Sequence, residues 1–164
     1  IRQLKAAVGD ERIVREIGLT KPRDCLGYRL IAKSIERIAD HAVGIARNVL
    51  RIKSPLDEDI CVGFREFSTF AIAGFDDAVK SLFAKDYSLA DDVIERKRRI
   101  ETMEREEIRE ILAAELDAES ISSLRLIVDS LRRTIEYASD IAEVVLNLTI
   151  LEEKQQLAIY GVSR

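Results

Sequence analysis

Residues 34 to 48 read SIERIADHAVGIARN and place two carboxylates, those of Glu36 and Asp40, four positions apart. On an α-helix this spacing brings both side chains to one face, about one turn apart along the axis. The stretch TIEYASDIAEVVLN repeats the spacing 100 residues later with Glu136 and Asp140. The acidic pair is therefore half of an internal repeat, and this repeat governs how the rest of the chain is interpreted.

An apolar seam is repeated together with the acids. From Tyr28 to Ile52 apolar residues recur at alternating spacings of three and four, which predicts a long helix, preceded by shorter helical patterns over residues 1–8 and 11–17. A second stripe beside this seam contains Glu36, which places that carboxylate at the edge of the core. The seam consists of Tyr28, Ile31, Ile35, Ile38, Ala42, Ile45, Val49 and Ile52, and its later counterparts are Val128, Leu131, Ile135, Ala138, Ala142, Val145 and Thr149.

Two further long helices are predicted between the two copies of the seam. After a Ser-Pro break, residues 57–83 form a helix that carries all five phenylalanines, which we expect to pack in the core. Residues 88–114 form the next helix, in which Lys97, Glu101 and Glu104 occupy the middle of the seam. These polar side chains face either a polar pocket or solvent.

The composition favours helices around a single core. Of 164 residues, 47% are hydrophobic and 34% are charged, while 7 glycines, 2 prolines and 5% aromatic residues leave little material for sheets. We therefore predict an all-α fold, an antiparallel bundle of long helices. The net charge of −4 disfavours a nucleic-acid-binding surface. Without a signal peptide or an apolar run of about 18 residues, we expect a cytoplasmic protein that does not insert into a membrane.

A carboxylate at the edge of a helical core needs a partner, because an unpaired buried charge is unfavourable. One interpretation is ordinary salt bridges with lysines and arginines on the same helices. Another is a hard cation, which carboxylates bind well. A di-iron enzyme site needs Glu-x-x-His on two helices, whereas the only histidine, His41, is adjacent to Asp40. Neither a nucleophile triad nor a phosphate-binding glycine loop is present, so the sequence does not predict an enzyme.

The first copy resembles a known family. IERIADHAVGIARNV is similar to the signature helix of the PhoU family, whose members regulate phosphate uptake, and Glu136 with the run from Asp140 to Glu143 resembles the second, weaker copy of that signature. The stretches IVREIGLTKPRDCLGYRLIAKSIERIADHA and FAKDYSLADDVIERKRRIETMEREE are similar to other parts of the family, the first to its archaeal branch. The resemblance extends over about residues 1–150.

This resemblance implies repeated three-helix units, of which the first is truncated. Residues 1–52 would be the end of the first unit without its opening helices, residues 53–152 the second unit, and residues 153–164 a tail. Because Ile1 already lies inside a helical pattern, we expect the sequence to be a C-terminal fragment of a longer protein.

The resemblance also implies metal ligands. The family's E-x-x-x-D motif, on the last helix of each unit, is associated with bound iron or zinc, and a facing acidic motif lies on the middle helix. In that facing motif Lys97 replaces one ligand, and its ammonium group could take the place of the cation. The predicted ligands are Glu36, Asp40, Glu136, Asp140 and Glu101.

The function expected from the resemblance is negative regulation of phosphate uptake through protein contacts. The expected partners are a phosphate ABC transporter or a sensor kinase, and the expected assembly is a homodimer. Two alternatives remain open: a metal-binding or metal-storage helical bundle, and a helical scaffold or dimerisation module of a transcriptional regulator.

Overall fold

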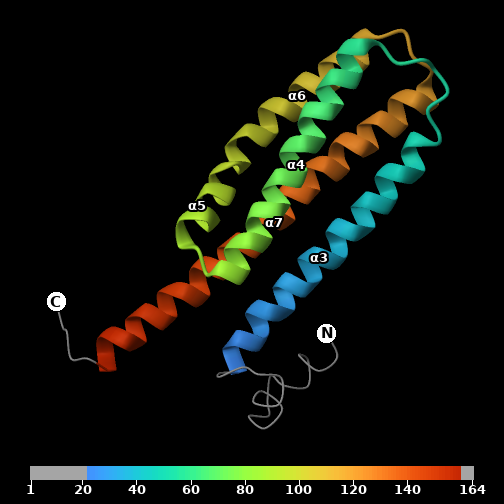
Figure 1. Ribbon diagram of the computed structural model, residues 1–164. Coiled ribbons are helices and arrows are strands. Elements are labelled where there is room, and N and C mark those ends of the chain that lie inside the picture. The colour runs from blue at the N-terminus through green and yellow to red at the C-terminus, as the bar shows by residue number, and fades with distance from the viewer. Residues whose placement is uncertain (1–21, 160–164) are drawn as a thin grey trace.

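A computed structural model describes the backbone of residues 22–159 and the side chains of residues 24–148 (Figure 1). All regular structure in this part of the chain is helical, which confirms the predicted all-α fold. The short helices predicted over residues 1–8 and 11–17 lie outside the described residues. None of the helices within residues 22–159 combines the length and apolarity that a membrane crossing needs. The helices are α3 (Pro22–Val49), α4 (Glu58–Ala84), α5 (Tyr87–Glu95), α6 (Lys97–Ala113) and α7 (Ala118–Ile159).

α7 is the central helix of the bundle (Figure 1). It packs against all four other described helices, whereas α3 packs against α7 alone. α4, α5 and α6 also pack against one another. The predicted seam of α7 is accordingly buried along its described length, from Val128 to Val145. α7 continues to Ile159, so the helix extends over the first residues of the tail predicted from residue 153.

The prediction for the first copy of the seam is only partly right. Ile31 is buried, but Tyr28, Ile35 and Val49 are exposed. α3 is rotated so that polar residues such as Ser34 are buried on its inner face. The same apolar pattern is buried to different extents in the two helices, because α3 has one neighbour among the described helices and α7 has four. Ile135 is thus fully buried, whereas its counterpart Ile35 is 41% exposed.

α3 and α7 run antiparallel and meet at equivalent positions of the repeat (Figure 1). Arg37 Nη1 donates a hydrogen bond to Tyr137 Oη at 3.3 Å, and these residues are 100 positions apart. Gly44 follows Arg37 by seven residues, and a Cβ on Gly44 would lie 3.8 Å from Oγ of Ser130, which precedes Tyr137 by seven residues. The two copies of the helix therefore pack about an approximate two-fold axis that passes near Arg37 and Tyr137.

The helix predicted over residues 88–114 is divided into α5 and α6 at Arg96. The guanidinium of Arg96 forms an ion pair with Asp77 of α4 and lies 5.9 Å from the ring centroid of Phe70. The backbone tightens at the same point, because Arg99 N–H donates to the carbonyl of Arg96 at 3.0 Å. Arg96 is thus anchored on α4 at the residue where α5 and α6 meet, a contact that the apolar spacing does not reveal.

The core prediction for α4 holds along most of the helix. Ile60, Phe67, Ala71 and Ala78 are buried, while Phe64, Phe70 and Phe75 pack partly buried against the two apolar clusters of the core. Phe83 is the exception, because it is 83% exposed near the end of α4. The prediction that this phenylalanine belongs to the core is wrong.

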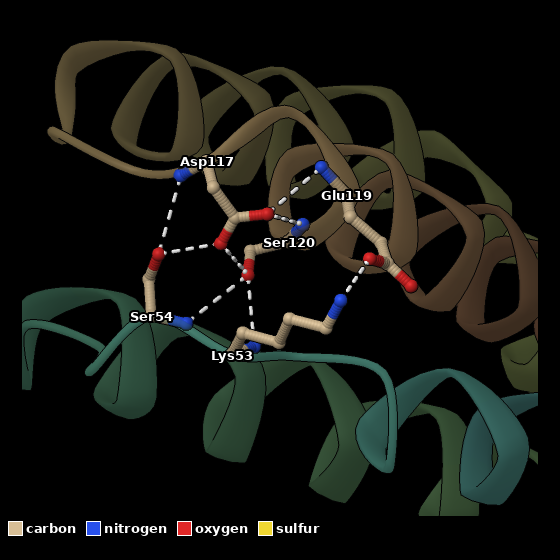
Figure 2. Close-up of polar contacts among 5 residues, drawn as sticks. All are labelled: Lys53, Ser54, Asp117, Glu119 and Ser120. Atoms are coloured by element: carbon tan, nitrogen blue, oxygen red, sulfur yellow. Dashed lines mark hydrogen bonds and ion pairs between the residues drawn. The ribbon is translucent and has the colours of Figure 1, made fainter.

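The break between α3 and α4 is held against the start of α7 (Figure 2). The backbone N–H groups of Lys53 and Ser54 both donate to Ser120 Oγ, at 3.0 and 3.2 Å. Asp117 caps α7 by accepting from Ser120 N–H at 3.0 Å, and it also accepts from Ser54 Oγ at 2.6 Å. Hydrogen bonds from Ser120 and Ser54 hold the pKa of Asp117 well below its usual range. Lys53 Nζ completes this junction with an ion pair to Glu119 at 2.5 Å.

Replacement of Ser120 by alanine removes the acceptor of two backbone N–H groups and one partner of Asp117. Because Ser120 is fully buried, we expect Ser120→Ala to lower the free energy of unfolding by about 1–3 kcal/mol in urea denaturation. Ser122→Ala, at an exposed position of the same helix, is the matched control and should cost less than about 0.5 kcal/mol. Equal stability of Ser120→Ala and the wild type would contradict the role given to this junction.

Candidate functional site

The first acidic pair lies on the outer surface of α3. Lys33 Nζ approaches Glu36 Oε1 to 3.1 Å, and both side chains are about half exposed. Asp40 is exposed as well. The prediction that Glu36 lies at the edge of the core is therefore wrong, because Glu36 lies on the exposed side of α3, which has one neighbour among the described helices.

The second acidic pair has a different environment, because Glu136 is held by two arginines. Glu136 Oε1 accepts from Arg132 Nη1 at 2.5 Å, and Oε2 accepts from Arg133 Nη1 at 3.1 Å. Arg132, whose side chain is 21% exposed, also pairs with Asp129 at 2.7 Å and with Glu104 of α6 at 3.6 Å. Arg132 thus lies among three carboxylates, and the charge of Glu136 is neutralised by protein cations.

Asp140, the other member of this pair, is influenced by a lysine of α6. Partial burial raises the pKa of Asp140, nearby Glu143 raises it further, and the charge of Lys97 opposes both effects. Lys97 Nζ lies 3.9 Å from Glu143 Oε1. The ammonium of Lys97 therefore acts on Asp140 through its charge, while Glu101 is exposed on α6.

One difference between the two copies of the repeat explains the contrast. Arg132 precedes Glu136 by four residues, a spacing at which helical side chains meet. The equivalent position before Glu36 is occupied by Ala32. Glu36 therefore lacks the arginine that neutralises its counterpart.

Within the described part of the chain, no three His, Cys, Asp or Glu side chains are grouped in a way that could hold a metal ion. The second pair fits a metal poorly, because Arg132 and Arg133 already occupy both oxygens of Glu136. The first pair offers two carboxylates from a single helix. Metal binding therefore stays a prediction for its five candidate ligands, Glu36, Asp40, Glu136, Asp140 and Glu101.

His41, the histidine next to Asp40, takes part in the contact between α3 and α7. Its ring is stacked on Tyr137 with 5.9 Å between the ring centroids and an interplanar angle of 29°. Arg37 lies over the same tyrosine, 5.8 Å from its centroid. This aromatic and cationic contact joins the two copies of the signature helix next to their acidic pairs.

The sequence interpretation missed one buried acid, Glu107 of α6, which is 6% exposed. Its only sequence signal is its spacing, seven residues after Ile100 and four before Ile111, both of which are buried. In a helix with many glutamates, this spacing did not distinguish Glu107 from its exposed neighbours.

Comparison with known families connects this geometry to a function. A family model of the PhoU domain matches residues 64–145, which is half of the chain and extends from α4 into α7. The chain belongs to the PhoU family. The match includes the second copy of the repeat, with Arg132 and Glu136, although the first copy carries the closer resemblance to the PhoU signature. Searches among curated proteins and among solved structures gave no match. PhoU proteins form a regulatory family that acts in phosphate homeostasis.

Replacement of Arg132 by methionine removes the charge at the centre of the second acidic pair while keeping much of the side-chain volume. The carboxylates of Glu104 and Asp129 lose a cation, and Glu136 keeps only Arg133. We expect a loss of about 1–3 kcal/mol in the free energy of unfolding, measured by urea denaturation. Arg133→Met, at a more exposed position, should cost less than about 1 kcal/mol. Equal losses in both variants would argue against a central role of Arg132.

Proposed function

We propose that this PhoU-family protein is a negative regulator of phosphate uptake that acts in the cytoplasm, as a homodimer, by contact with a phosphate ABC transporter or its sensor kinase. The observation that carries the proposal is the PhoU-domain match over residues 64–145. The duplicated acidic helix supports it, because the same signature occurs at equivalent places on α3 and α7.

The outer face of α3 supports the proposed action through protein contacts. Large apolar side chains are exposed on this helix beside Glu36 and Asp40, and neighbouring exposed apolar residues are typical of interaction surfaces. Val43, three residues after Asp40, is 49% exposed. The exposed large apolar residues of α3 are Leu26, Tyr28, Leu30, Ile35, Val43 and Val49, and Leu50 follows the helix directly.

The proposed partners are tested with purified transporter components and purified sensor kinase. We expect one of the two to bind the protein, and Val43→Asp to weaken that binding at least about tenfold, since a charge would have to be desolvated in an apolar contact. Ile72→Asp is the matched control, because Ile72 is an exposed apolar residue of α4, and it should leave the affinity unchanged. Deletion of the gene should raise phosphate uptake. The proposal fails if neither partner binds and uptake is unaffected.

A second candidate function is metal binding, and the first acidic pair favours it. Glu36 has one lysine partner in place of two arginines, and Asp40 is exposed next to it. The double variant Glu36→Ala, Asp40→Ala should then lose iron or zinc that the purified wild-type protein retains, as measured by elemental analysis. Equal metal content in the two proteins would reject a metal site at this pair.

A further inference from the structure

The contact between α4 and α6 contains a carboxyl group in unusual surroundings. Glu107 of α6 is 6% exposed, and its Oε2 is enclosed without a hydrogen-bond partner among the described residues. The carboxyl group lies directly against the backbone of Gly63 in α4. A Cβ at Gly63 would overlap Glu107 Oε1 and would approach Cδ to 2.7 Å. Glycine is therefore needed at position 63 for the two helices to enclose this side chain.

The charges that act most strongly on Glu107 are all negative. They belong to Glu110 and Glu106 on α6 and to Glu66 on α4. The third helix of this region, α7, contributes apolar residues such as Leu124 to the core cluster that contains Ile111. Burial, followed by repulsion from the three glutamates, raises the pKa of Glu107 to about 7. The carboxyl group thus gains or loses its proton near neutral pH.

We propose that the α4–α6 contact at Gly63 and Glu107 is a proton-sensitive joint, closed when the carboxyl group is protonated and loosened when it is ionised. The ionised group needs water or a cation, and neither the glycine backbone nor the apolar core supplies one. Outward movement of this part of α6 provides access to water. The same helix carries Glu104, which pairs with Arg132. Loosening of α6 therefore also affects the ion pairs around Glu136.

The direction of the pH effect follows from proton binding. The closed joint binds its proton more tightly than the open one, in which the pKa returns toward the ordinary value of 4.5. Opening therefore becomes more favourable as the pH rises from about 4.5 to about 7 and levels off above 7. A single proton limits the change to about tenfold per pH unit.

Hydrogen exchange of the full chain tests the joint between pH 5 and 8.5, after correction for the intrinsic pH dependence of amide exchange. We expect protection over residues 97–113 and in the first half of α4 to fall by up to about tenfold per pH unit below pH 7 and to level off above it. Glu107→Gln, which cannot ionise, should abolish this fall. Glu101→Gln is the matched control, because Glu101 is exposed on the same helix and is not among the charges that act most strongly on Glu107, and it should retain the fall.

A carbon-13 titration of the glutamate carboxyl groups measures the same event directly. Glu107 should titrate with a midpoint near 7. Gly63→Ala should displace the carboxyl group toward solvent and move this midpoint toward 4.5. The proposal is overturned if Glu107 of the wild type titrates below about pH 5.5, or if Glu107→Gln shows the same pH-dependent loss of protection as the wild type.

Discussion

The packing of α7 against the four other described helices is the constraint on which the rest of the structure depends. A helix with several neighbours needs a wide apolar face, and α7 has one from Leu124 to Val145. The buried positions include serines such as Ser139, whose small side chains let neighbouring helices approach closely. α3, α4, α5 and α6 each depend on this one helix for much of their buried surface. Glu136 of α7 is only 26% exposed and is paired with Arg132 and Arg133 of the same helix.

The two copies of the signature helix illustrate how a repeat can keep its sequence pattern and lose its equivalence in three dimensions. Both copies contribute to one antiparallel contact, with Arg37 and Tyr137 at its centre. Only the second copy is covered by α4, α5 and α6, and only that copy has an arginine one turn before its glutamate. The less exposed Glu136 therefore has Arg132 as a partner, whereas the exposed Glu36 has Ala32 at the equivalent position. Among the described helices, α3 consequently keeps more of its apolar side chains exposed than α7 does.

Much of the fold could be predicted from the sequence, because apolar spacing reports directly on burial when a helix is well covered. The bounds of α4 and the seam of α7 follow from that spacing. It fails for α3, where the one neighbour among the described helices cannot bury a wide stripe, and it does not reveal the break at Arg96, which is paired with Asp77 of another helix. The sequence has Arg132 in the second copy at the position where the first copy has Ala32. How this difference affects the two acidic pairs became clear only from the contact between Arg132 and Glu104. The raised pKa of Glu107 depends on Gly63 of another helix, and no pattern within α6 contains that information.

The central claim is that α3 and α7 pack antiparallel, with Arg37 and Tyr137 at the centre of their contact. It is tested most directly by disulfide formation in a variant with Gly44→Cys and Ser130→Cys, in which both native cysteines are replaced by alanine. The 3.8 Å separation between a Cβ at Gly44 and Ser130 Oγ is within reach of a disulfide. The structure predicts rapid formation of an intrachain disulfide under mild oxidation, and little of it when Val43→Cys replaces Gly44→Cys. Absence of the first disulfide, or equal yields for the two pairs, would contradict the arrangement of the helices described above.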